Sequence, residues 1–164
     1  MSDASNREQR EVYLKDHYAG AVGALELIEH SIDSHEGTPW AAFFTELQGE
    51  IKADHEQLHS LMTALGFDDS GVRNAGAWVA EKLGRAKLGF SGGETSDLRL
   101  LQTLETLFLG ITGKQLLWRA LRAAGDSSPV LQKTDFDLLE RRAIAQLEKV
   151  EAKRLEAAKA AFPA

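Results

Sequence analysis

The sequence LRLLQTLETLFLGITGKQLLWRAL, residues 98–121, is the most apolar long stretch of the chain. A helix of this length is long enough to cross a bilayer. Charged side chains nevertheless interrupt the stretch at Arg99, Glu105, Lys114 and Arg119. Because charges in hydrocarbon are costly, we expect this helix in a protein core and not in a membrane. The other helices of the chain are expected to pack against it.

Length and composition indicate a single domain, 1–164, because 164 residues suffice for one buried core. The chain has no cysteine, which excludes disulfides and thiolate metal sites and fits a cytoplasmic protein. Its N-terminal residues, MSDASNREQREVYLKDHY, lack the apolar core of a secretory signal. A net charge of -6, with both signs interspersed, argues against nucleic acid as a partner.

The first half of the chain predicts two antiparallel helices joined by a tight turn. Ser5 and Glu8 form a capping box at the start of a helix over 5–34. The segment SHEGTP then supplies a glycine stop, a threonine N-cap and a proline at the first helical position. A second helix over 39–65 ends at a glycine. The apolar residues at helical spacing are Leu14, Tyr18, Ala21, Val22, Leu25, Ile28 and Ile32, then Phe44, Leu47, Ile51, Leu58, Leu61 and Leu65.

The second half predicts another antiparallel pair. Ser96 is the expected N-cap of a helix that runs to Gly125, and residues 126–134 are expected to form a loop. A last helix begins around Thr134. Its inner face is predicted to contain Phe136, Leu139, Ala143, Leu147, Val150, Ala157 and Ala161. The long connection between the pairs is expected to contain a short amphipathic helix with Trp78 on its apolar face.

Two hairpins with a long connection resemble the ferritin-like four-helix bundle, in which the second and third helices run parallel. The segments DHYAGAVGALELIEH, AWVAEKLGR and LETLFLGITGKQLLWRAL are similar to a group of small, uncharacterised bacterial ferritin-like proteins. This resemblance implies an all-α, ferritin-like fold with an extra short helix in the connection. It implies no activity, because that group has none assigned. A thirty-residue connection also permits a simple up-down order.

The resemblance raises the question of a di-iron site. Such sites use a carboxylate on each of two helices and a Glu-x-x-His pair on each of the other two. The chain has one such match, Glu56 to His59, but helical geometry turns Glu56 away from the core and leaves His59 at its edge. The last helix has no histidine, so the second pair is missing. The sequence therefore predicts no complete di-iron site.

Four carboxylates remain for an alternative, degenerate site that would bind iron or manganese. Hairpin arithmetic puts Glu26 and Glu50 at similar heights, with Asp54 one turn further along. Glu105 is the carboxylate that the third long helix supplies. His17 lies within a turn of Asp54, and a hydrogen bond between them is favoured over a proton-transfer dyad. Either His17 or His59 would complete the metal shell.

The charges of the two C-terminal helices predict interhelical ion pairs. Pairing the helices about their loop places three charged residues of the first helix opposite residues of opposite charge on the second. The expected pairs are Glu105 with Arg154, Arg119 with Glu140, and Arg122 with Asp137.

Together these patterns favour a non-enzymatic bundle that acts through protein contacts, with a stress-related accessory role or a homodimer as candidates. The homodimer rests on Leu109 and Leu117, which we expect to be exposed. The alternative is a degenerate metal-binding or oxidoreductase protein of the same fold. A third hypothesis is a small-molecule pocket between the hairpins, although aromatic residues at helical spacing are more often core. That pocket would be lined by Trp118, Phe108 and Trp78.

Overall fold

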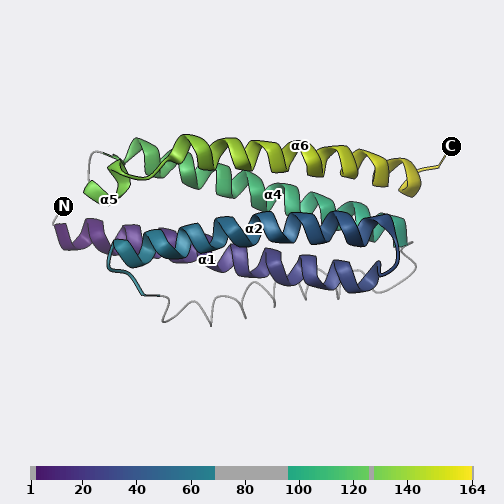
Figure 1. Cartoon of the computed structure of the whole chain (residues 1–164), viewed down its shortest axis with the longest axis horizontal. Coiled ribbons are helices and arrows are strands. Elements are labelled where there is room, and N and C mark those ends of the chain that lie inside the picture. Colours follow the sequence, from purple (N-terminus) through teal and green to yellow (C-terminus); the bar gives the residue numbers. More distant parts are fainter. Residues whose placement is uncertain (1–2, 69–95, 126–127, 164) are drawn as a thin grey trace. The chain divides into compact units, whose positions relative to one another are not determined.

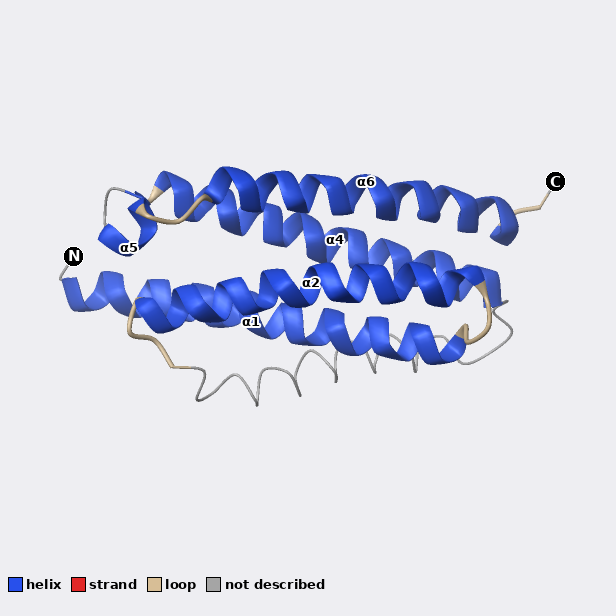
Figure 2. Ribbon diagram, viewed as in Figure 1, coloured by secondary structure: helices blue, strands red, loops and turns tan. Residues whose placement is uncertain are grey.

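The computed structural model describes residues 3–68, 96–125 and 128–163. All regular structure in these ranges is helical, and no strand occurs among them (Figure 2). The helices are α1 (Asp3–Ser34), α2 (Pro39–Ala64), α4 (Ser96–Ala123), α5 (Pro129–Gln132) and α6 (Phe136–Ala161), labelled in Figure 1. The prediction of an all-α protein is thereby confirmed.

The chain divides into two compact units, Met1–Lys82 and Leu83–Ala164. The first contains α1 and α2, and the second contains α4, α5 and α6. The predicted single domain stays a prediction. The predicted connecting helix, with Trp78, lies outside the described residues. In the part of the chain that is described, no helix has the length and apolar character that a membrane span requires.

In the first unit, α1 and α2 pack against each other as an antiparallel hairpin (Figure 1). Gly37 has a φ of 76°, which suits glycine, and Thr38 then adopts an extended conformation as the N-cap of α2. The Thr38 hydroxyl donates a hydrogen bond to the His35 carbonyl (2.7 Å). Gly66, with a φ of 75°, follows the end of α2. The predicted turn and helix ends are confirmed.

The predicted start of α1 is wrong. The helix already begins at Asp3, so Ser5 lies inside its first turn and is not its N-cap. A side chain from the start of α1, that of Arg7, contacts the residues that follow α2. The Arg7 guanidinium donates to the Gly66 carbonyl (2.8 Å) and lies over the Phe67 ring, 5.0 Å from its centroid. The early residues of α1 therefore contact the end of α2.

The apolar face of this unit largely follows the predicted spacing. Most predicted residues of α2 are buried, although Leu65 is only partly buried, and those of α1 are buried or half-buried. On α1, Leu27 and Ser31 are buried although neither was predicted, and the Ser31 hydroxyl donates to the Leu27 carbonyl (2.7 Å). The buried apolar residues of the two helices are Leu14, Ala19, Leu27, Ile28, Phe44, Leu47, Ile51, Leu58, Leu61 and Met62.

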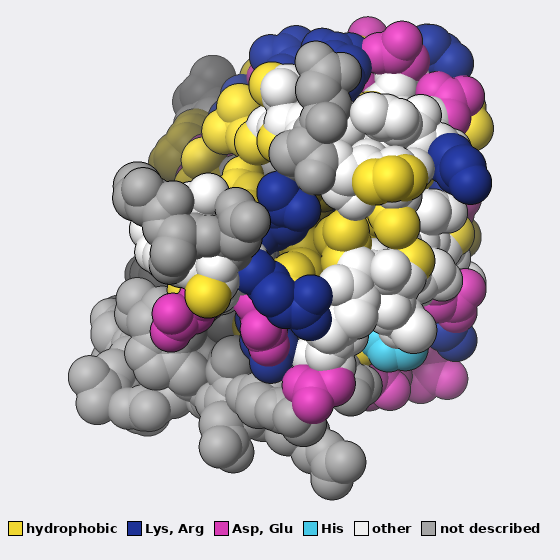
Figure 3. Space-filling view, turned by 90° about the vertical axis from the view of Figure 1, so that its left-hand side faces the viewer, with side chains coloured by type: hydrophobic (Ala, Val, Ile, Leu, Met, Phe, Trp, Pro, Cys, Tyr) yellow, Lys and Arg dark blue, Asp and Glu magenta, His cyan; other side chains and the backbone are white. Residues whose placement is uncertain are grey.

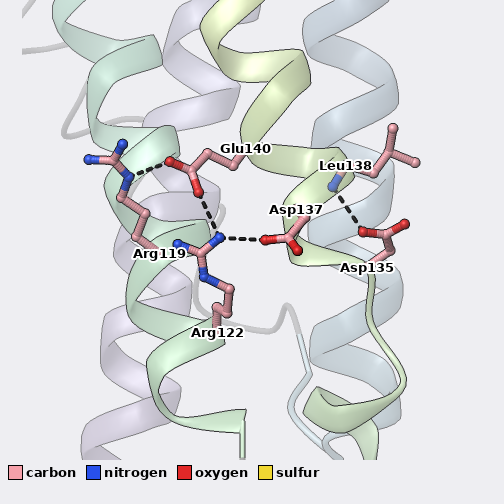
Figure 4. Close-up of polar contacts among 6 residues, drawn as sticks. All are labelled: Arg119, Arg122, Asp135, Asp137, Leu138 and Glu140. Carbon is pink, nitrogen blue, oxygen red and sulfur yellow. Dashed lines mark hydrogen bonds and ion pairs between the residues drawn. The ribbon is translucent and has the colours of Figure 1, made fainter.

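In the second unit, α4 and α6 form an antiparallel pair joined through α5 (Figure 1). The predicted loop there is wrong, because Pro129–Gln132 is helical and Leu131 is buried. The Ser128 hydroxyl caps this short helix by accepting from the Val130 amide (3.3 Å). The N-cap of α6 is Asp135, whose carboxylate accepts from the Leu138 amide (2.9 Å; Figure 4).

Ion pairs join α4 and α6 at two separate places along the helices. The three predicted pairs, Glu105 with Arg154, Arg119 with Glu140, and Arg122 with Asp137, are confirmed. Glu140 also pairs with Arg122 (2.9 Å), so its two oxygens hold two arginines (Figure 4). The hydrogen bond from Arg119 is the main reason that the pKa of Glu140 lies below its usual value.

We predict that Glu140→Gln lowers the free energy of unfolding and Glu148→Gln, an exposed change on α6, leaves it almost unchanged. A carboxylate with a lowered pKa stabilises the fold above its usual value of 4.5, and this stabilisation is lost as the pH falls below that value. The difference between the two variants should therefore shrink in acid. Urea unfolding at neutral and acidic pH measures it. Equal stability of the variants at neutral pH would contradict the prediction.

Two glycines of the first unit should respond oppositely to alanine. Gly49 lies in α2, and a Cβ added there meets no atom within 4 Å, whereas Gly37 has a φ that alanine rarely adopts. We expect Gly49→Ala to stabilise the protein by about 0.5–1 kcal/mol and Gly37→Ala to destabilise it by at least as much. Thermal and urea unfolding provide the measurement. The same sign for both variants would refute the assignment of the turn.

Candidate functional site

The first unit contains a group of aromatic and histidine rings, Tyr13, His17, Tyr18, His55 and His59, which we call the His–Tyr group. Tyr18 of α1 stacks on His55 of α2, with ring centroids 4.2 Å apart. The His59 ring lies 5.8 Å from Tyr18, and Tyr13 meets the His17 ring edge-on at 4.7 Å. The antiparallel hairpin brings these rings together because Tyr18 and His55 lie at matching distances from its turn.

Burial lowers the pKa of two histidines of this group, His55 and His17. It lowers the pKa of His55, and the neighbouring His59 lowers it further, while Glu56 acts in the opposite direction. Burial also lowers the pKa of His17, against a smaller effect of Asp16. The His55 Nε2 atom is buried and has no hydrogen-bond partner among the described residues. A proton taken up there would lack an acceptor, so this ring serves packing better than proton transfer.

The expected hydrogen bond between His17 and Asp54 does not form within the described ranges. Asp54 is buried as predicted, with 2% of its surface exposed, but the ring neighbour of His17 is Tyr13. The Tyr18–His55 stack shows why, because it places Asp54 level with Ala19 instead of His17. Counting residues from the turn predicted the position of His17 along the hairpin to within one helical turn of Asp54. It did not predict the direction in which the His17 side chain points.

The four candidate carboxylates have different surroundings. Glu26 is exposed, Glu50 is half-buried and Asp54 is buried. Glu105 belongs to the second unit, where one of its oxygens accepts from Arg154 (3.4 Å). Within the described ranges no three His, Asp or Glu side chains gather into a group that could hold a metal ion. The described residues therefore give no support to the degenerate metal site.

The Glu-x-x-His match to a di-iron motif, Glu56 to His59, also lies away from the core. Glu56 and His59 of α2 are both exposed, which confirms the outward direction predicted for Glu56. The tryptophan hypothesis is tested only in part, since Trp78 is outside the described residues. Trp118 is buried and its ring lies 6.4 Å from Phe136, a neighbour that the sequence reasoning did not identify. Trp118 thus packs in the core of its own unit.

Exposed leucines distinguish one face of α4. Leu109 is 71% exposed, which confirms the prediction for it. The prediction for Leu117 is wrong, because Leu117 is only 1% exposed and Leu116 is 53% exposed. Leu116 lies seven residues after Leu109, almost the same direction on a helix, whereas Leu117 is turned about 80° away. This seven-residue spacing was the signal that could have identified the pair.

The face drawn in Figure 3 shows Lys and Arg side chains next to Asp and Glu side chains, with apolar side chains between them. Among the described residues on this face the two signs are interspersed, as the mixed sequence predicts. Comparison of the chain with protein-family models, with curated proteins and with solved structures finds no match. The site must therefore be interpreted from its own residues.

The His–Tyr group predicts a loss of stability in mild acid. The folded state lowers the pKa of His55, so the unfolded chain binds more protons below the usual value of 6.5. The free energy of unfolding should thus fall as the pH drops from about 7.5 to about 5.5.

Replacement of the His55 ring tests the predicted loss of stability in mild acid. His55→Phe keeps the stack on Tyr18 and should reduce the pH dependence, whereas His30→Gln, at an exposed position on α1, should retain it. Urea unfolding at several pH values measures the slopes. An unchanged slope in His55→Phe would show that other groups cause the effect.

Proposed function

We propose that this chain is a non-enzymatic, ferritin-like helical bundle without a complete di-iron site, which acts through contacts with protein. The observation that carries the proposal is the pair of exposed leucines, Leu109 and Leu116, on one face of α4. Large exposed apolar side chains that recur on one helix face are typical of interaction surfaces. The ferritin-like arrangement, a bacterial source and a cytoplasmic location are parts of this proposal that rest on the sequence resemblance.

The surroundings of the candidate ligands support the non-enzymatic part. Glu105 engages Arg154, Glu26 is exposed, and Glu56 and His59 are both on the outside of α2. A di-iron centre needs buried carboxylates and imidazoles at one height. The rings of the His–Tyr group pack against one another, and burial lowers the pKa of His17 and His55. A stress-related accessory role remains a candidate within this proposal.

Metal content tests the proposal directly. Protein purified from cells supplied with iron and manganese should contain far less than one metal ion per chain. The matched variant Glu26→Gln/Glu50→Gln should give the same low value. Elemental analysis by mass spectrometry is the measurement. Stoichiometric iron or manganese that disappears in this variant would refute the proposal and support the alternative, a degenerate metal-binding or oxidoreductase bundle.

A further inference from the structure

One face of α4 carries a charged residue near each end, a leucine inside each charge, and two small residues in the middle. With about 100° between successive residues, these side chains fall within about 120° of arc, and we call them the α4 stripe. The stripe comprises Glu105, Leu109, Thr112, Gly113, Leu116 and Arg119. From its first to its last residue it spans about 21 Å of the helix.

The apolar side chains at the centre of the stripe are largely exposed to solvent. Leu109 and Leu116 are 71% and 53% exposed. Between them lies Gly113, where an added Cβ would meet no atom within 4 Å. Glycine weakens a helix interior, and here no close packing within the described chain requires it. A small residue between two exposed leucines instead lets another helix approach closely.

The ends of the stripe carry opposite charges that retain bonding capacity. Arg119 is 51% exposed and contacts Glu140 through Nε, and its two terminal nitrogens point away from Glu140 (Figure 4). Glu105 is 48% exposed and accepts from Arg154 through one oxygen at 3.4 Å. Each group can therefore accept or donate further hydrogen bonds without giving up its partner on α6.

The order of these residues matches an antiparallel pairing of the stripe with itself. Leu109 and Leu116 lie equally far on either side of the point between Thr112 and Gly113. Glu105 and Arg119 lie almost equally far from the same point, and both fall on the same flank of the leucines. A two-fold axis through that point keeps each flank on its own side. One register therefore forms both leucine contacts and both charge contacts.

We propose that two copies of this chain associate through the α4 stripe, antiparallel about this two-fold axis. Leu109 packs against Leu116 of the partner subunit, and Glu105 pairs with Arg119 of the partner subunit. This inference rests on the proposed function and names its partner as a second copy. A second copy fits because the stripe carries both halves of every contact. Since the stripe is short for an interface, the dimer forms reversibly and depends on concentration.

Sedimentation equilibrium on the full chain tests the apolar part. The unsubstituted protein should show a monomer–dimer equilibrium, and Leu109→Ser/Leu116→Ser should raise the dissociation constant at least about tenfold. The matched control is Val12→Ser, at an apolar side chain of α1 that is 56% exposed. It should leave the dissociation constant unchanged. Circular dichroism checks that each variant folds.

Charge reversal tests the register. Glu105→Arg and Arg119→Glu should each weaken the dimer, because each places like charges together twice. The double variant Glu105→Arg/Arg119→Glu restores opposite charges across the axis and should recover dimerisation. Within one chain the double variant places like charges together, Arg at position 105 beside Arg154 and Glu at position 119 beside Glu140. Recovery of the dimer therefore cannot come from a more stable monomer. A double variant that dimerises no better than either single change would overturn the proposed pairing.

Cysteine cross-linking gives an independent measure of direction, because the chain contains no cysteine of its own. A mixture of Leu109→Cys protein and Leu116→Cys protein should form disulfide-linked dimers faster than either protein alone. In the antiparallel register, identical positions would be separated by about 10 Å along the helix, too far for a disulfide. Faster linking of either variant with itself would show a parallel or unrelated contact and overturn the inference.

Failure of this inference can be separated from failure of the proposed function. A protein that stays monomeric at high concentration, yet contains no stoichiometric metal, refutes the homodimer alone. Stoichiometric metal that depends on Glu26 and Glu50 refutes the proposed function whatever the oligomeric state. A dimer that the Leu109→Ser/Leu116→Ser variant does not weaken places the interface on another surface and overturns the inference about α4.

Discussion

Glu140 pairs with Arg119 through one carboxylate oxygen and with Arg122 through the other. The register of α6 along α4 depends on this contact. Burial of leucines contributes most of the stability, at about 1.5–3 kcal/mol for each fully buried side chain. Apolar contacts are poorly directional, however, and α4 has apolar residues on much of its circumference. An ion pair at the surface adds little to the free energy of unfolding, but its two groups meet in one register only. Its contribution is thus mainly to specificity.

The first unit obtains its register differently. Its turn is short and built from a glycine with positive φ, an extended threonine and a proline, which leaves little freedom in how α2 returns along α1. The rings of the His–Tyr group then meet at matching distances from that turn. Because the His55 ring stacks on Tyr18 and burial lowers its pKa, this hairpin uses histidine as an aromatic packing residue. We therefore expect the stability of this hairpin to depend on pH through His55.

Helix α4 differs on its two sides. Leu104, Leu107 and Ile111 are buried, whereas Leu109 and Leu116 are exposed. The charged residues at the boundary pair with α6 and still retain hydrogen-bonding capacity. A helix with such a boundary can keep its own unit in register and present a second apolar surface. This arrangement links the internal architecture of the second unit to the proposed contact between copies.

The sequence by itself determined the all-α class, the turn at Gly37, the end of α2 and the three ion pairs between α4 and α6. These features depend on local backbone preferences and on the number of residues between positions along a helix. Both can be obtained from the sequence alone. For the candidate site it determined that Asp54 is buried and that Glu56 points outward, because both follow from helical direction.

Only the tertiary structure decided which of Leu116 and Leu117 is exposed, that His17 faces Tyr13 instead of Asp54, and that Leu131 anchors a short helix in an expected loop. These positions lie at the edge of a helix face or in a connection. Their burial depends on which neighbouring element covers them, and helical spacing carries no information on that neighbour.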